Sequence, residues 1–143
     1  MKKKSLFIIL ILSFIQVHAS EYEHSEVHDL MAYILDPAAE VIWDSAGFII
    51  TEEGETNLAP TNQEEWDRVK HAAKVISGSS YLLSRPEVVA DKTQWVSLSI
   101  ALKGVGEKLF EAAENKDSES LFKTGAELYQ VCVACHQVYW IKD

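Results

Sequence analysis

The sequence predicts an all-α protein, an antiparallel four-helix bundle. Apolar residues recur three and four positions apart in four segments, which is the period of amphipathic helices. No stretch alternates apolar and polar residues as a half-buried strand would. The chain holds only three prolines, at positions 37, 60 and 86, and they punctuate the helical pattern. Four helices joined by loops pack as a bundle around one core.

Residues 1–19 predict a signal peptide that does not belong to the fold. Three lysines at positions 2–4 precede an apolar run from Leu6 to Val17, and compact residues offer a cleavage site after Ala19. The run is shorter than the roughly 20 residues that cross a bilayer, so we expect cleavage rather than a membrane anchor. The mature chain, residues 20–143, has the length of a single domain with one core.

The mature chain is strongly acidic. Cleavage removes three of the thirteen Lys and Arg, and the remaining ten face twenty-two Asp and Glu, a formal charge of −12. A surface of this sign repels nucleic acids and anionic membranes, so neither is expected as a partner. An acidic surface permits a basic protein partner, but it can equally have no role beyond keeping the protein soluble.

Residues 24–47 predict the first helix. Pro37 either kinks this helix or splits it, and Gly47 suits its C-terminal end. Residues 48–60 hold turn and charged residues without a sustained period, so they predict a connecting loop. The apolar stripe of the helix consists of Val27, Leu30, Met31, Ile34, Leu35, Val41, Ile42 and Trp43.

Two further helices follow the loop. Thr61 and Glu64 form a capping box that opens the second helix, and Pro86 ends it near Arg85 by disfavouring helical geometry in the preceding residue. The third helix is expected over about 91–115, with Asp91 as its N-cap.

The third helix contains Gly104 and Gly106, which cost about 1 kcal/mol each relative to Ala. Close approach of the backbone to a neighbouring helix, or to a flat cofactor, would offset that cost, and helix packing is the preferred explanation. A fourth helix is capped by Asp117 or Ser118, and its apolar stripe continues as far as His136.

Near the C-terminal end of the fourth helix lies the segment Cys132-Val133-Ala134-Cys135-His136, which holds both cysteines of the chain. Residues three and four apart share a helix face, so the two thiols and the imidazole project from one side. C-x-x-C-H is the spacing at which a c-type haem is attached. Two thioether bonds to the porphyrin and a His136–iron bond would hold the cofactor.

Two other interpretations of the same residues remain open. A disulfide between Cys132 and Cys135 would suit a thioredoxin-like redox motif, but such motifs open a helix after a strand, and this one lies near a helix end. Zinc is disfavoured because structural zinc takes four ligands and no second Cys or His pair is evident.

In layout and motif, the chain resembles the cytochromes c′ and their low-spin relatives of the cytochrome c-556 type. Those are secreted four-helix bundles with C-x-x-C-H near the C-terminus of the last helix. The resemblance implies a periplasmic protein with one covalent haem c, bound through Cys132 and Cys135 and ligated by His136. It implies possible dimerisation through the first two helices. One departure is Trp140, where many cytochromes c′ carry a basic residue.

The sixth iron position decides the function. In the family it faces the first helix, where low-spin members use a methionine, and Met31 is the only methionine after the initiator. Met31 either ligates iron as a soft thioether or fills a gap in the core. His28 and His24 are alternative ligands, and Arg68, Lys70 and Arg85 are candidate partners of the haem propionates.

Two functions follow from these alternatives. With the sixth site filled, the protein is a single-electron carrier that meets redox partner proteins. With the site open and apolar, it is a five-coordinate haem protein that binds nitric oxide or carbon monoxide. Enzymatic turnover is not expected, because no distal acid–base group can be assigned.

Overall fold

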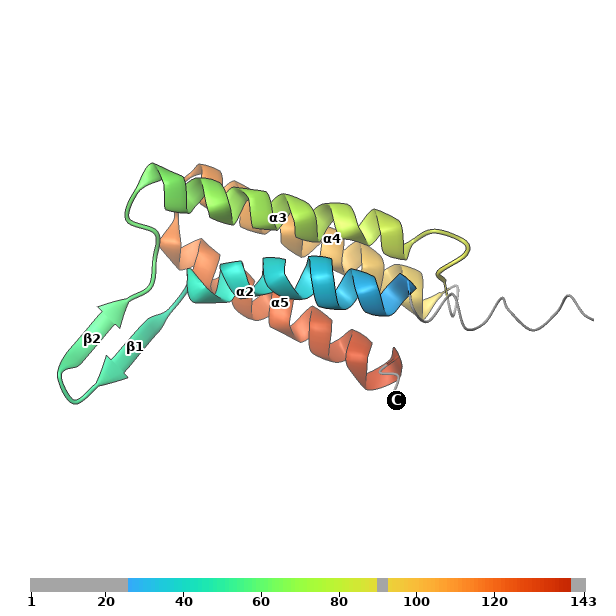
Figure 1. Ribbon diagram of the computed structural model, residues 1–143, viewed down its shortest axis with the longest axis horizontal. Helices are drawn as coiled ribbons and strands as arrows, with labels where there is room; N and C mark the ends of the chain where they lie inside the picture. Colours follow the sequence, from blue (N-terminus) through green and yellow to red (C-terminus); the bar gives the residue numbers. More distant parts are fainter. Residues whose placement is uncertain (1–25, 90–92, 140–143) are drawn as a thin grey trace, which may run out of the picture.

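The computed structural model describes residues 26–89 and 93–139, and in these the chain is mostly helical with one small hairpin (Figure 1). The predicted signal peptide, His24, Asp91 and Trp140 lie outside the described residues. The elements are η1 (Met31–Leu35), α2 (Asp36–Asp44), β1 (Phe48–Thr51), β2 (Gly54–Asn57), α3 (Gln63–Leu83), α4 (Gln94–Glu114) and α5 (Ser118–Tyr139). In the described residues, no helix is long and apolar enough to cross a membrane.

The first helix passes through its proline without breaking. Residues 26–30 are α-helical, η1 is one wider π turn, and α2 continues to Asp44. The Asp36 N–H donates to the Met31 carbonyl, five residues back. Pro37 has no N–H to donate, and in a regular α-helix its ring would collide with the Tyr33 carbonyl. The π turn before Pro37 is therefore the local adjustment that keeps the helix continuous, so of the two predicted alternatives, a kink or a split, the split is wrong.

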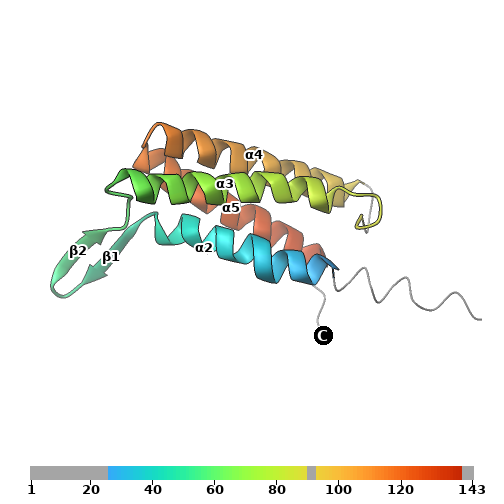
Figure 2. The ribbon, with the colours of Figure 1, turned by 45° about the horizontal axis from the view of Figure 1, so that its top comes forward.

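The helices lie side by side around one apolar core (Figures 1 and 2). Helix α3 packs against α4, α4 against α5, and α2 against both α3 and α5. Gly106 explains how α3 and α4 approach each other, because a Cβ built there would lie 2.6 Å from the Ser77 backbone nitrogen. The predicted packing role of Gly106 is confirmed, whereas a Cβ on Gly104 would meet nothing within 4 Å. The largest fully buried side chains are Ile42, Val69, Ile76, Leu109, Leu121 and Leu128.

The segment after the first helix is a β-hairpin, so the prediction of an irregular loop is wrong. Strands β1 and β2 pair antiparallel, from Phe48 opposite Asn57 to Thr51 opposite Gly54. Gly54 has φ +138°, a value that favours glycine, and it completes the tight turn. All residues of both strands are exposed, so the hairpin projects from the helices (Figure 1). An alternating pattern is missing because neither face is buried.

The N-terminal caps of α3 and α5 can be compared with the predicted ones. Helix α3 is capped by Asn62, whose side chain accepts the Glu65 N–H at 3.0 Å, so the predicted capping box is displaced by one residue. Helix α5 is capped as predicted, because Asp117 Oδ1 accepts the Ser120 N–H at 3.0 Å.

Candidate functional site

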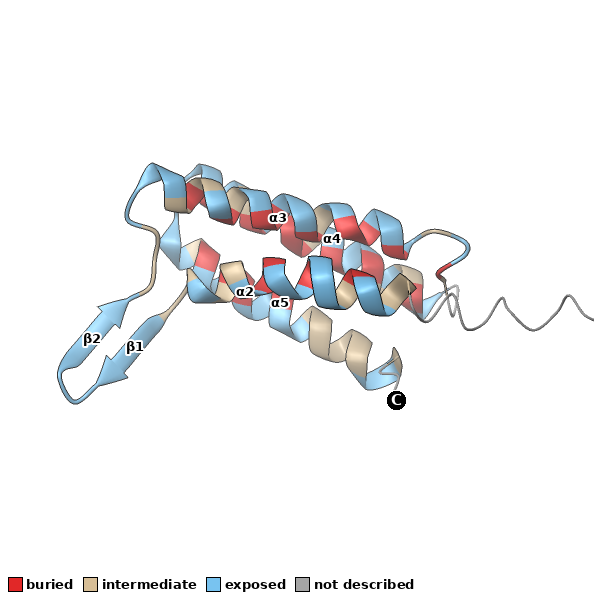
Figure 3. Ribbon diagram, in the orientation of Figure 1, coloured by how far each residue is buried: buried red, intermediate tan, exposed pale blue. Residues whose placement is uncertain are grey.

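The candidate site lies on the C-terminal part of α5. The helix is regular through Cys132, Cys135 and His136, so their spacing places the three side chains on one side, as predicted. Upstream the same helix buries Leu121 and Leu128 in the core. Residues 131–136 are all half-buried, as the tan colour of this part of α5 shows in Figure 3. The core-facing stripe of α5 thus becomes a half-open apolar surface at the motif.

Both cysteines are free thiols. Burial raises the pKa of the Cys132 thiol, with smaller effects from Cys135 and from the Asp36 carboxylate, and burial also raises the pKa of Cys135. Redox-active C-x-x-C motifs show the opposite shift, because a helix N-terminus or a basic neighbour stabilises the thiolate. The electrostatics therefore disfavour the thioredoxin-like interpretation.

The imidazole of His136 is half-buried, and burial lowers its pKa. A lowered pKa favours the neutral ring at pH 7, which is the form that ligates a metal ion. Two thiols and one neutral imidazole on an apolar helix face match the donor set of a c-type haem. Within residues 26–89 and 93–139, no three His, Cys, Asp or Glu side chains form a group that could hold a metal ion.

Three helix ends meet beside the motif. The ring of Tyr139, at the end of α5, contacts Trp95 edge-on with a centroid distance of 4.9 Å. Trp95 opens α4 and donates from Nε1 to the Leu83 carbonyl at the end of α3, at 2.7 Å. These contacts hold the motif-bearing end of α5 against α3 and α4.

Met31 is at the same end of the molecule as the motif. The first helix and α5 run in opposite directions, so residues 26–35 lie at the end that α5 reaches with residues 131–139 (Figures 1 and 2). Asp36 acts electrostatically on Cys132. Met31 belongs to this end of the first helix and packs half-buried against the core.

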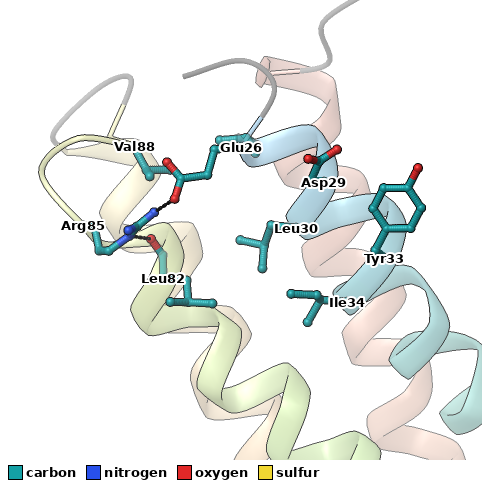
Figure 4. Close-up of a pocket in the computed structure, with 9 residues that line it drawn as sticks. Glu26, Asp29, Leu30, Tyr33, Ile34, Leu82, Arg85 and Val88 are labelled. Atoms are coloured by element: carbon teal, nitrogen blue, oxygen red, sulfur yellow. Dashed lines mark hydrogen bonds and ion pairs between the residues drawn. The ribbon is translucent and has the colours of Figure 1, made fainter. Parts of the chain in front are cut away.

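The other candidate iron ligand and the candidate propionate partners lie in different surroundings. The side chain of His28 is 68% exposed and faces Asp29 at 3.5 Å, so it lies on the solvent side of the first helix. Lys70 is paired with Asp67 at 2.7 Å. Arg85 forms an ion pair with Glu26 at the motif end of the molecule (Figure 4), whereas Arg68 is exposed near the start of α3.

Two features of the site were not predicted. The π turn η1 carries Met31, and its only sequence indication is Pro37 two residues beyond its end. The proximity of Asp36 to Cys132 joins residues far apart in the chain, which no local pattern reveals.

No protein-family model, curated protein or solved structure matched this chain significantly.

Proposed function

We propose that this protein is an exported c-type monohaem cytochrome with an antiparallel four-helix bundle fold, which carries single electrons in the periplasm. The observation that carries the proposal is the presence of Cys132, Cys135 and His136 on one half-buried face of α5. A bound haem supplies a one-electron Fe(II)/Fe(III) couple.

In this proposal the two thiols hold the cofactor covalently. Each thiol adds across one vinyl double bond of the porphyrin, the sulfur to one carbon and the hydrogen to the other, so no group leaves. The half-buried apolar flanks, Val131, Val133 and Ala134, limit water near the attachment point. Such exclusion of water helps to set a reduction potential.

His136 is the proximal iron ligand in this proposal, and Met31 is the distal one. Met31 is supported by its place in the segment of the first helix that lies at the same end of the molecule as the end of α5, and by a half-buried side chain that packs against the core. A filled sixth position favours electron transfer over the capture of diatomic gases. This is the reason for preferring an electron carrier to a gas-binding protein.

Haem attachment is tested by expressing the full chain together with c-type haem maturation factors. We expect haem that stays bound to the polypeptide in denaturing electrophoresis, and loss of that haem in the double variant Cys132→Ala, Cys135→Ala. His71→Gln is the matched control for His136→Gln, because His71 is exposed on α3. A haem-free protein with a Cys132–Cys135 disulfide would refute the cytochrome and revive the thiol redox interpretation.

The sixth ligand is tested by optical spectra of the reduced protein before and after carbon monoxide. We expect a low-spin spectrum that does not respond to the gas, and conversion of Met31→Leu to a high-spin form that binds it. Leucine conserves apolar volume, so a merely space-filling Met31 would leave the spectrum unchanged. A wild-type spectrum that shifts with carbon monoxide would instead establish the gas-binding function.

Export is tested on the same preparation. Cleavage after Ala19 predicts a mature chain that begins at Ser20, and intact mass measurement of the periplasmic fraction reports it directly. Recovery of the uncleaved chain in the membrane fraction would contradict this part of the proposal.

A further inference from the structure

An apolar groove of about 320 Å³ runs between α2 and α5 on the surface, lined by Trp43, Ala46, Phe122, Ala126 and Tyr129 among others. Its walls are held in place. Trp43 Nε1 donates to the Gly125 carbonyl at 3.0 Å, and the Trp43 ring meets Tyr129 edge-on at a centroid distance of 6.2 Å. Phe122 is 52% exposed and Tyr129 55% exposed, so the groove presents two large aromatic rings to solvent.

The hairpin begins at one end of this groove. A Cβ built on Gly47, the residue before β1, would lie 3.5 Å from the Phe122 ring. Strand β1 then exposes three consecutive large apolar side chains, of which Ile50 is 78% exposed. In the described residues β1 and β2 pair only with each other, so their outer edges are unpaired. The groove and β1 thus adjoin where Gly47 approaches Phe122, and in the residues that the structure describes both present large apolar side chains to solvent.

The distribution of charge around this surface indicates the charge of the partner that would bind there. Residues 5–67 contain thirteen Asp and Glu and no Lys or Arg, whereas residues 68–143 contain nine Asp and Glu and ten Lys and Arg. The first helix and the hairpin belong to the acidic part and lie next to each other (Figure 1). Two of the bases near this side are paired with acids, since Lys123 on α5 contacts Glu119 at 2.6 Å and Lys108 on α4 contacts Glu127 on α5 at 2.8 Å.

Three exposed acids follow one another along α2, the helix that contributes Trp43 to the groove. Asp36, Glu40 and Asp44 are four residues apart, which places like charges on one side of a helix, an arrangement that destabilises it. The turn of the hairpin adds exposed Glu52 and Glu53. An apolar centre with an acidic rim is complementary to an apolar centre with a basic rim.

We propose that the groove and strand β1 together dock a partner protein that presents Lys and Arg around an apolar patch. A second copy of this chain is disfavoured, because its own acidic face would oppose the same charges. Tyr129 precedes Cys132 by three residues, or about 4.5 Å along the helix axis. A partner seated in the groove therefore lies close to the haem attachment segment, and identifying it as a redox partner rests on the proposed function.

The test uses a lysine-rich, positively charged c-type cytochrome as the probe, and the same probe with its lysines succinylated as the control. Binding to the full mature chain is measured by isothermal titration calorimetry at two ionic strengths. We expect binding of the basic probe alone, weakened at the higher ionic strength because salt screens exposed charges. Equal binding of the succinylated probe would overturn the proposal.

Variants separate this surface from general charge attraction. The triple variant Asp36→Asn, Glu40→Gln, Asp44→Asn should weaken binding by about tenfold or more at low salt. The control triple variant Glu87→Gln, Glu111→Gln, Glu114→Gln removes the same charge from exposed positions outside the groove and should bind nearly as the wild type. Equal losses in the two triple variants would refute a specific docking surface.

The apolar centre is tested separately by Tyr129→Ser and Ile50→Thr, exposed positions where the fold should persist. Both substitutions should weaken binding of the probe at high and low salt alike, and the helical circular dichroism signal should stay unchanged. Unaltered binding would overturn the role of the groove, and a dimer in sedimentation that Tyr129→Ser dissociates would show that a second copy occupies it. Haem content is measured on every variant. Loss of probe binding in a protein that still carries haem would refute the docking surface and leave the cytochrome proposal standing. Probe binding by a protein that carries no haem would support the docking surface and refute the cytochrome proposal.

Discussion

The close contact between α3 and α4 at Gly106 predicts that Gly106→Ala lowers the free energy of unfolding. In Gly106→Ala the new methyl carbon would lie 2.6 Å from Ser77 N, 2.8 Å from Ser77 Cβ and 2.9 Å from Ser77 Cα. Two of these three atoms belong to the backbone and cannot rotate away. The two helices must therefore move apart.

The magnitude is the balance of two effects. Overpacking a tight contact costs about 1–3 kcal/mol, and an immovable backbone places this case near 3 kcal/mol. Replacing glycine by alanine inside a helix returns about 1 kcal/mol. We therefore expect Gly106→Ala to lower the free energy of unfolding by about 2 kcal/mol.

Gly104→Ala is the matched control on the same helix. Its new methyl would meet nothing within 4 Å, so only the helix-propensity gain of about 1 kcal/mol remains. Urea unfolding followed by circular dichroism measures both variants, which should differ from each other by about 3 kcal/mol. A Gly106→Ala variant as stable as Gly104→Ala would refute the close approach of α3 and α4.

Three further predictions concern the site end and the helix starts. Trp95→Phe keeps an aromatic ring against Tyr139 but leaves the Leu83 carbonyl without its donor, so urea unfolding should show a loss of about 1–2 kcal/mol. Asn62→Ala removes the side chain that caps α3 and should cost about 1 kcal/mol in the same assay, whereas Thr61→Ala should cost less. Hydrogen bonds from the Ser120 N–H and hydroxyl lower the pKa of Asp117, so the stability that this carboxylate contributes is present above its unfolded pKa of about 3.9 and lost as pH falls through the folded value. The difference between wild type and Asp117→Ala should therefore shrink as the pH falls below the unfolded pKa of about 3.9 in acid unfolding curves, and a constant difference would contradict the assigned hydrogen bonds.

Local spacing predicted the parts of the structure that depend on a single segment. The periodic apolar stripes predicted a mostly helical chain, which is confirmed. The spacing of Cys132, Cys135 and His136 predicted a shared face because helix geometry relates residues three and four apart whatever lies around them. The cost of Gly106 likewise pointed to a close helix contact. Local competition between neighbouring residues was harder to predict, since Asn62 caps α3 where Thr61 was expected.

The hairpin escaped prediction for a physical reason. Alternation arises when one face of a strand is buried, and every residue of β1 and β2 is exposed. Its pairing depends instead on the turn that ends at Gly54, a weaker indication than a buried face.

By itself the sequence determined that Cys132, Cys135 and His136 share one face of a helix, that the chain is acidic and that it is mostly helical. Only the tertiary structure decided that the start of the first helix lies at the same end of the molecule as the end of α5, that Asp36 acts on Cys132, and that Trp43 and Tyr129 wall one groove. Each of these relations joins the first helix to α5, segments separated by most of the chain. They arise from the burial of apolar faces that brings the helices together, and such packing leaves no period within either segment alone.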